Sequence, residues 1–363
     1  MNPYLARLEP YFSLPKKHVK LNRERLSAFV YEVALQELEA PSWKEPVYPV
    51  DDLEFVQFLG MGSSINFYYT DLATGEKFQT LWPECGLCRQ VVSFYAEIGK
   101  RKFRCIAHGV EATMWGGAYA MWACLKRAEG DGISITDARF LRDKQKWTKE
   151  LARFVFRGTE PVPVIPMLIE RHKLLRDSAV FLEGYRNKWM NVFKLAKFRA
   201  FNDGSGAVEL LANFSSYHDE YLGFSGSSGP AIPFYKRAHL FVQMYEGRAR
   251  ASEVLPRIKD PELLILPADY ELPRALRAKQ ITEYSPALLE RIVNKREVKE
   301  GSRMEIEIRL ATVEAGEILE KEINFLRKAH NLPLYTKVET DYLLWTSGRA
   351  HSETHHITRT TKY

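Results

Sequence analysis

The feature that most constrains the fold is a helical repeat of apolar residues near the C-terminus. Charged Glu317 and Lys321 lie four positions apart outside this repeat, where we expect them to pair. Over residues 307–330, apolar side chains recur every three or four positions, at Ile308, Ala311, Ala315, Ile318, Leu319 and Leu326. That spacing gathers them on one face of a long helix, which needs other elements to cover it.

The same period predicts helices along most of the chain. Asp137, or Thr136 before it, is expected to cap a further helix. Residues 77–114 instead look rich in strands, residues 53–69 form an apolar segment broken by Gly60 and Gly62, and residues 1–22 look irregular. The sequence therefore predicts a mainly α-helical protein with a minor β part. The expected helices cover residues 22–39, 117–128, 167–185, 189–201, 207–214, 234–247, 285–295, 307–330 and a short segment from 341.

Composition excludes several classes of protein. The 363 residues can bury a large core in one domain or two, and 45% hydrophobic with 27% charged residues is ordinary for a globular protein. No run of 18 apolar residues occurs, and charges and prolines interrupt the first 20 residues, so we expect a cytoplasmic protein without a membrane partner. The formal net charge of +6 permits a polyanionic partner such as nucleic acid without requiring one.

Two short pairs of cysteine and histidine have the spacing of a zinc site. Cys85 and Cys88 form CGLC, and Cys105 with His108 forms CIAH. Four such ligands could hold a tetrahedral zinc ion, but the second pair lies in an extended segment without a clear tight turn. We therefore expect ordinary reduced thiols and no bound metal. Cys124 is expected to pack in the core.

One acid occupies an unusual position in the stretch LLILPADYELPRALRAKQI, residues 263–281. Asp269 lies between an apolar run and the start of a helix, with Pro267 before it and Pro273 in the first helical turn. A carboxylate at the edge of buried segments is partly desolvated, which suits it to stabilise a cation or to accept a proton from water. The alternative is structural: Asp269 caps the helix or turns the chain.

An ordered set of strings resembles the queuosine salvage proteins. The strings include SSINFYY, GAYAMWACLKRAEGDGISIT, IPMLIERHKLL, FSSYHDE, PFYKRAHL, PADYELPRAL, ITEYSPALLERI, GSRMEIEIRLATVEAGEIL, DYLLW and HHITRTTKY. Each string alone is weak evidence, but together they span nearly the whole chain in the family's order.

The resemblance implies a fold and an activity. Its members are mainly helical single-domain proteins, similar in fold to helix-hairpin-helix DNA glycosylases, that hydrolyse the N-glycosidic bond of queuosine 5'-monophosphate to release queuine. For this chain it implies one domain over residues 1–363, a monomer and no cofactor. Asp269 corresponds to the family's acid and Lys236 to its lysine, so both are expected to be catalytic; the substrate-binding residues would be Asn66, Phe67, Tyr235, Arg237, Tyr270 and Arg274.

Each role has a physical meaning and an alternative. Breaking the bond between a base and a sugar passes through an oxocarbenium-like state, which a fixed carboxylate such as Asp269 can stabilise. Lys236 and Arg237 could hold a phosphate. Alternatively, Lys236 is a solvated helix charge, and Arg237 is the partner of a buried acid such as Glu307.

This chain also departs from the family at four positions. Ser63 and Met244 stand where the family has acids, Thr70 where it has tryptophan, and Arg274 where it has glutamine. Queuine carries a secondary ammonium group, so the loss of two acids and the gain of an arginine favour a base without a positive charge.

A predicted insertion relative to the family adds basic and aromatic residues. It covers about residues 78–114 and contains KRKFR, while residues 1–50 form an arm and a helix with KKHVK. These features suit a flipped base with flanking phosphates, so the preferred interpretation is a DNA glycosylase that excises a bulky modified base, in a bacterial or phage-defence setting. One alternative is a queuosine 5'-monophosphate N-glycosylase. A third is a nucleic-acid-binding module that has lost activity.

Overall fold

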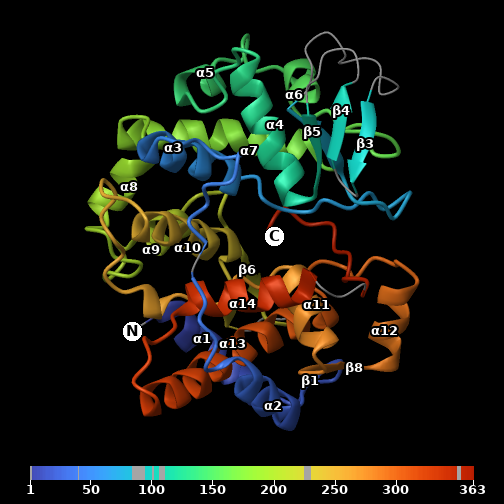
Figure 1. Cartoon of the computed structure of the whole chain (residues 1–363), viewed down its shortest axis with the longest axis vertical. Helices are drawn as coiled ribbons and strands as arrows, with labels where there is room; N and C mark the ends of the chain where they lie inside the picture. Colours follow the sequence, from blue (N-terminus) through green and yellow to red (C-terminus); the bar gives the residue numbers. More distant parts are fainter. Residues whose placement is uncertain are drawn as a thin grey trace. The chain divides into compact units, whose positions relative to one another are not determined.

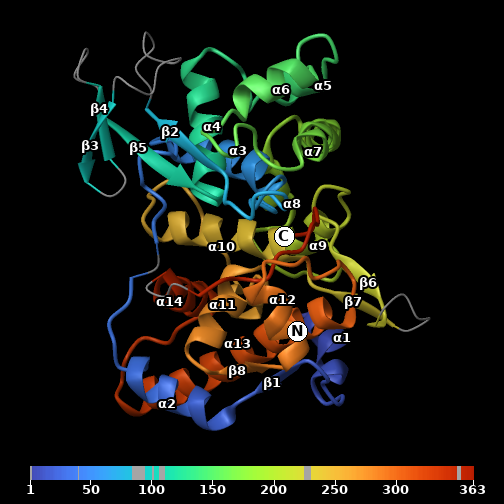
Figure 2. The ribbon, with the colours of Figure 1, turned by 90° about the vertical axis from the view of Figure 1, so that its right-hand side faces the viewer.

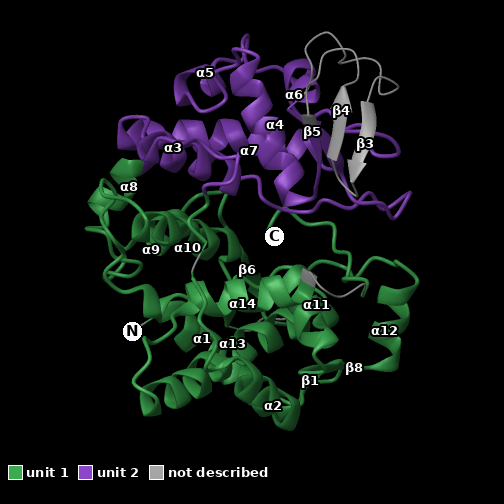
Figure 3. Ribbon diagram, in the orientation of Figure 1, with its two compact units in different colours: residues 1–43, 190–363 green, residues 44–189 purple. Residues whose placement is uncertain are grey.

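The chain forms two compact units, coloured separately in Figure 3. Unit 1 comprises Met1–Trp43 and Met190–Tyr363, and unit 2 comprises Lys44–Trp189. The computed structural model describes residues 2–39, 41–83, 95–99, 102–105, 111–224, 230–349 and 353–363. No helix among these residues is both long and apolar enough to cross a membrane. The expected single domain, N-terminal arm and insertion stay predictions.

Unit 1 is built mainly from helices, with two short strand pairs, β1 with β8 and β6 with β7 (Figure 1). Its elements are α1 (Pro3–Phe12), β1 (Val19–Leu21), α2 (Arg23–Val33), α9 (Ala207–Ala212), β6 (Glu220–Leu222), β7 (Ala231–Pro233), α10 (Lys236–Arg250), η4 (Pro261–Leu263), α11 (Glu271–Ala278), β8 (Thr282–Tyr284), α12 (Pro286–Val293), α13 (Arg303–Ala329) and α14 (Lys337–Arg349), and α8 (Trp189–Leu195) begins at its boundary.

Unit 2 combines helices with the one larger sheet found among the described residues. Its strands pair antiparallel in the order β2-β5-β4-β3, which confirms the strand-rich prediction for residues 77–114. The elements are α3 (Asp52–Ser63), β2 (Gln79–Trp82), β3 (Tyr95–Gly99), β4 (Lys102–Cys105), β5 (Glu111–Gly116), α4 (Ala118–Gly130), α5 (Ala138–Arg142), α6 (Lys149–Val155), α7 (Leu168–Phe181) and η2 (Leu182–Tyr185). The chain is therefore mainly α with a minor β part, as predicted.

The long helix α13 organises unit 1. It begins at Arg303, four residues before the predicted start, and contacts α1, α2, α11 and α14, in agreement with its position in the two ribbon views (Figures 1 and 2). At Gly316 the helix approaches residue 266 so closely that an added Cβ would lie 2.4 Å from the side chain of Leu266. Glu317 pairs with Lys337 on α14, at 3.1 Å between Oε1 and Nζ, and not with Lys321 as predicted. The tertiary partner thus replaces the local one.

The prediction of an irregular N-terminus was wrong. Residues 3–12 form α1, because the Asn2 side chain accepts hydrogen bonds from the backbone N–H groups of Tyr4 and Leu5, and Pro3 occupies the first helical position. Leu8 and Tyr11 then pack with Ile232 and Ile306 in one core cluster. These partners are distant in sequence, so local residue types gave no sign of them.

Gly60 and Gly62 do not break their segment either, because α3 continues through both positions. A Cβ on Gly60 would lie 2.4 Å from the ring of Trp189, and one on Gly62 would lie 1.7 Å from the ring of Trp122. The glycines therefore make room for tryptophans on neighbouring helices.

Several local signals were read correctly. Asp137 caps α5 by accepting the N–H of Arg139 at 2.8 Å. The helix α2 lies within the helix predicted over residues 22–39, and it buries Leu26, Phe29, Val30 and Val33. Cys124 lies buried in α4, as expected.

Candidate active site

The segment of residues 264–268 runs through the core of unit 1 outside any strand pairing. Leu266 belongs to a cluster with α2, α11, α13 and α14, whereas Ile265 and Ala268 belong to a second cluster with α1. The segment is therefore buried on two sides, and its backbone polar groups need partners there.

Side chains supply those partners. His239 and Gln243, one turn apart on α10, bind the N–H and the carbonyl of Ile265 at 3.4 and 2.9 Å. Arg309 on α13 donates from Nε to the carbonyl of Ala268 at 3.0 Å. Burial lowers the pKa of His239 to about 3, so its ring stays neutral and can accept the backbone N–H. The residue that follows this segment is thus held on a fixed backbone.

Asp269 follows directly, and both of its carboxylate oxygens are engaged. Oδ1 accepts the backbone N–H groups of Glu271 at 2.8 Å and Leu272 at 3.3 Å, which caps the start of α11. Oδ2 lies 3.4 Å from Nζ of Lys236, and 18% of the side chain stays exposed. The structural alternative was therefore correct about capping. It does not exclude the chemical role, because the cap orients a carboxylate that solvent still reaches.

Lys236 is the first residue of α10 and is almost fully buried, with 3% of its side chain exposed. The alternative that it is a solvated helix charge was wrong. Burial lowers the pKa of Lys236, and the neighbouring carboxylate of Asp269 opposes that shift. The preceding residue, Tyr235, has a left-handed backbone conformation with φ of 43°, which residues other than glycine seldom adopt.

A buried ion pair fixes this strained entry to α10. Arg309 donates from Nη1 and Nη2 to the two carboxylate oxygens of Asp219, at 2.8 and 2.5 Å, and both side chains are fully buried. Asp219 Oδ2 also accepts the backbone N–H of Lys236 at 3.0 Å. Burial alone would raise the pKa of Asp219, but the charge and hydrogen bonds of Arg309 and the N–H of Lys236 hold it below its usual value. Arg309 thereby holds backbone groups at both predicted catalytic residues: the N–H of Lys236 through Asp219, and the carbonyl of Ala268, which precedes Asp269.

A second acid, Asp341, belongs to the same site, and sequence reasoning missed it. It lies half-buried on α14 and interacts electrostatically with both Asp269 and Lys236. Burial, together with the charge of Asp269, raises the pKa of Asp341 to about 8, against the opposing charge of Lys236. The only sequence signal was its place in the string DYLLW. Nothing in that string indicates that it meets a residue on another element.

The remaining predicted residues of unit 1 surround these groups to different degrees. Tyr270 is half-buried, and its ring centroid lies 4.5 Å from that of His355. Tyr235 is buried, and its hydroxyl donates to Glu220 at 3.0 Å. Arg274 pairs with Glu271 one turn earlier on α11, at 2.6 Å, so a neighbouring carboxylate offsets its charge.

Arg237 is buried, with its guanidinium 5.9 Å from the ring centre of Tyr217. The suggested partner acid, Glu307, is instead bound by Arg303 at 2.7 Å and by the backbone N–H groups of Lys17, His18 and Val19. Glu307 is therefore engaged with other groups, and the pairing of Arg237 with a different buried acid stays a prediction.

Two predicted binding residues, Asn66 and Phe67, belong to unit 2, where both are buried. Asn66 Oδ1 accepts the hydroxyl of Tyr69 at 2.8 Å, and the guanidinium of Arg171 lies 4.1 Å from the ring centre of Phe67. Of the four departures from the family, Ser63 and Thr70 are buried in unit 2, Met244 is buried in α10, and Arg274 lies on α11. The binding roles of Asn66 and Phe67 stay predictions.

The suggested zinc ligands lie outside what the structure describes. Cys85, Cys88 and His108 are not among the described residues, and Cys105 is described only by its backbone in β4. Within the described ranges, no group of three or more histidine, cysteine or acidic side chains is placed to hold a metal ion.

Comparison with known proteins identifies the family. A family model described as queuosine salvage protein matches residues 50–363. The chain belongs to the queuosine salvage protein family. Two relatives of this family, both named queuosine 5'-phosphate N-glycosylase/hydrolase, illustrate the relationship. The protein of Sphaerobacter thermophilus is 30% identical over 254 residues, which cover 69% of this chain and 73% of that protein. The protein of Mus musculus is 29% identical over 273 residues, which cover 72% and 74%.

The match of the queuosine salvage family includes every predicted site residue, since these fall between Asn66 and Arg274. A third relative with the same name, from Dictyostelium discoideum, is 34% identical over 209 residues, or 55% of this chain and 59% of that protein. The family resemblance noted in the sequence is therefore confirmed.

Proposed function

We propose that this chain is an N-glycosylase that hydrolyses the base–sugar bond of a modified nucleotide, and that its substrate is queuosine 5'-monophosphate. The observation that carries the proposal is the state of Asp269. Its carboxylate is oriented by two backbone N–H groups and by Lys236, yet it remains partly exposed in an otherwise buried region. A carboxylate fixed in this way needs no reorganisation when positive charge develops on the sugar.

In the proposed reaction, Asp269 stabilises the oxocarbenium-like state and accepts a proton from the attacking water. Lys236 helps to hold the carboxylate of Asp269 in place, with its Nζ 3.4 Å from Oδ2. Its burial makes this role a better assignment for Lys236 than direct capture of a phosphate. Tyr270 and Arg274, next to Asp269 in the chain, are proposed to contact the substrate together with Tyr235 and Arg237 of the same unit.

The proposed substrate differs from the DNA base that the sequence analysis preferred. The named relatives act on queuosine 5'-phosphate, according to their names, and the family match extends over most of this chain. The gain of Arg274 is also weaker support for an uncharged base, since Glu271 offsets its charge at 2.6 Å. The basic string KRKFR, on which the DNA hypothesis relied, has no described side chains.

A comparison of substrates tests the proposal. The purified chain is incubated separately with queuosine 5'-monophosphate, the queuosine nucleoside without its phosphate, duplex DNA and hypermodified phage DNA. Free base and abasic sites are then measured. We expect queuine from the monophosphate and slower release from the nucleoside. Abasic sites in DNA without release of queuine would contradict the proposal and support the DNA glycosylase. No product from any substrate would support the binding module.

A further inference from the structure

In the candidate site, Lys236 interacts with two carboxylic acids. Lys236 begins α10, Asp269 precedes α11 and Asp341 lies on α14, and each of the three interacts electrostatically with the other two. One lysine can balance one carboxylate. In a mostly buried region, Asp269 and Asp341 repel each other when both are ionised, and Lys236 is the cation that acts on Asp341, so one of the two acids retains its proton.

Packing of α14 fixes the position of Asp341. Leu343 and Leu344 are buried in the core cluster that α14 shares with α11 and α13. Farther along, α14 approaches α11 so closely at Gly348 that an added Cβ would lie 2.8 Å from the Cβ of Ala275. Asp341 therefore sits on a helix that is pressed against the helix capped by Asp269.

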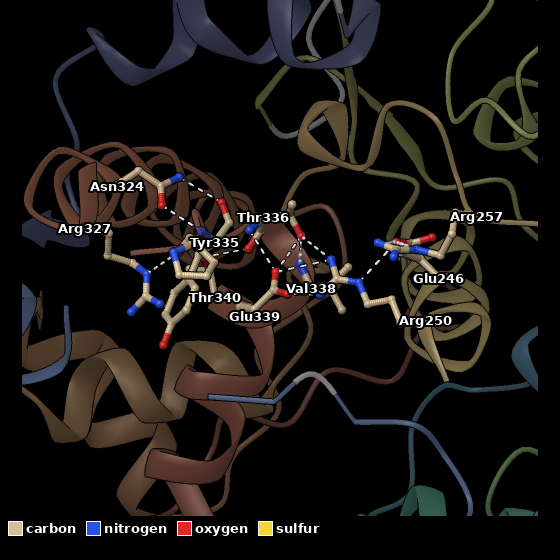
Figure 4. Close-up of polar contacts among 11 residues, drawn as sticks. Glu246, Arg250, Arg257, Asn324, Arg327, Tyr335, Thr336, Val338, Glu339 and Thr340 are labelled. Carbon is tan, nitrogen blue, oxygen red and sulfur yellow. Dashed lines mark hydrogen bonds and ion pairs between the residues drawn. The ribbon is translucent and has the colours of Figure 1, made fainter. Parts of the chain in front are cut away.

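A polar network anchors the beginning of α14 (Figure 4). The side chain of Glu339 accepts the backbone N–H and the hydroxyl of Thr336, at 2.8 and 2.7 Å. Arg250, at the end of α10, binds both Glu339 and Glu246. The helix that starts with Lys236 is thus tied to α14 two residues before Asp341.

Several other charged side chains of α11 and α14 form ion pairs of their own. Lys337 pairs with Glu317 and Glu320, and Arg250 pairs with Glu246 and Glu339. On α11, Arg274 pairs with Glu271, and Arg277 lies 3.8 Å from Glu353. The charged groups that act on Asp341 are Asp269 and Lys236. Of the two acids, Asp269 has the closer cation contact and two N–H donors, so the proton belongs on Asp341.

We propose that Asp341 is the general acid of this site, which gives its proton to the departing base while ionised Asp269 faces the sugar. The inference rests on the proposed N-glycosylase function and adds a second catalytic residue to it. An acid and a carboxylate held apart in their protonation states are the pair that hydrolysis of a glycosidic bond requires.

Base release by this pair conserves atoms, electrons and protons. The bond between the sugar C1′ and the base nitrogen breaks, its electron pair goes to the base, and the base gains the proton of Asp341. Water forms a new bond from its oxygen to C1′ and loses a proton to Asp269. Transfer of that proton through solvent to Asp341 restores both groups, so the sum is one water consumed for one base and one sugar hydroxyl formed.

Carboxyl NMR of the free protein tests where the proton lies, independently of any substrate. Protein labelled with ¹³C at the aspartate carboxyl is titrated, and the signal of Asp341 is identified by its loss in Asp341→Asn. We expect that signal to titrate with a midpoint of about 8. In Asp269→Asn the midpoint should fall, because the repelling carboxylate is gone. A midpoint near the usual value of about 4 in wild type would overturn the proposal.

Leaving-group dependence tests the catalytic step. Queuosine 5'-monophosphate is compared with 4-nitrophenyl ribofuranoside 5'-phosphate, whose phenolate departs without a proton. We expect Asp341→Asn to lower kcat on the nucleotide by about 10²- to 10⁴-fold, and on the nitrophenyl substrate by less than about tenfold. Wild type should also lose activity on the nucleotide as the pH rises above the midpoint, whereas the variant should not show this loss.

Controls separate the possible failures. Asp177→Asn removes a half-buried carboxylate that pairs with exposed Lys173 on α7, and it should behave as wild type on both substrates. Equal losses of kcat on both substrates in Asp341→Asn would overturn the assignment of Asp341 as general acid. If the wild-type protein still turns over the nucleotide in that case, the proposed N-glycosylase function stands. Wild type inactive on both substrates would overturn the proposed function and the general acid with it. If Asp341→Asn folds poorly by circular dichroism, the Asp341 carboxyl signal is assigned instead by through-bond correlation to its own backbone, and the NMR titration of wild type and Asp269→Asn decides alone.

Discussion

Arg309 and Asp219 form a two-point ion pair in the core of unit 1, with Nη1–Oδ1 and Nη2–Oδ2 separations of 2.8 and 2.5 Å. Through it, α13 holds the backbone N–H of Lys236 and, by a third bond, the carbonyl before Asp269. The two proposed catalytic residues are therefore positioned by one buried guanidinium.

This pair should be essential for folding. Asp219→Asn leaves Arg309 buried without a full counter-charge, and we expect a loss of about 3–5 kcal/mol in the free energy of unfolding. Urea denaturation measures it. Asp177→Asn, which affects a solvent-exposed ion pair with Lys173, should change the same quantity by less than about 1 kcal/mol. Similar small losses in both variants would show that the buried pair contributes little.

The two oxygens of Asp269 should be separable by mutation. The amide introduced by Asp269→Asn retains an oxygen for the N–H groups of Glu271 and Leu272, whereas Asp269→Ala removes the cap. Both changes should abolish most base release, but only the alanine variant should lose about 1 kcal/mol of stability. Thermal unfolding and product assays on the same samples check this. Equal destabilisation in both variants would contradict the capping role.

Stability should depend on pH through Asp341. Its pKa is about 8 in the folded protein, above the usual value, so the folded state holds a proton that the unfolded chain releases. The contribution of this group to stability is therefore present at acid pH and is lost as pH rises toward the folded value. Asp341→Asn should gain stability relative to wild type between about pH 5 and about pH 9, by on the order of a few kcal/mol. An unchanged difference in unfolding free energy between the two proteins at both pH values would contradict a proton on Asp341.

Close approach at Gly316 should make that position intolerant of a side chain. A Cβ there meets Leu266 at 2.4 Å, so Gly316→Ala should cost about 1–3 kcal/mol and disturb the segment before Asp269. Gly130, also in a helix, has nothing within 4 Å of an added Cβ. Gly130→Ala should therefore be neutral or slightly stabilising. Guanidinium unfolding of both variants makes the comparison, and equal effects would contradict the packing argument.

Local sequence signals predicted the helices better than their ends and partners. Periodicity located α13, and Asp137 was recognised as a cap, because both depend on neighbouring residues. Gly60 and Gly62 suggested a break in the helix, but no turn requires them. Each glycine leaves space for the ring of a tryptophan that is distant in sequence. The N-terminal helix α1 was missed for a similar cause: core residues of β7 and α13 stabilise it.

The site shows the same limit. Asp269 could be chosen from its place between an apolar run and a helix, and Lys236 from the resemblance to the family. Asp341 could not be chosen from the sequence. It joins the site because α14 packs against α11, and no local pattern predicts that contact. The role of Arg309 was hidden for the same reason, since Asp219 lies far away in the sequence.

Asp269 is proposed to act directly in the hydrolysis of a nucleotide base–sugar bond. The most direct measurement is the rate of queuine release from queuosine 5'-monophosphate by wild type and by Asp269→Asn, with circular dichroism to verify the fold. We predict release by wild type and a loss of at least about 10²-fold in the variant. Undiminished release by a folded Asp269→Asn, or no release by wild type, would contradict the claim.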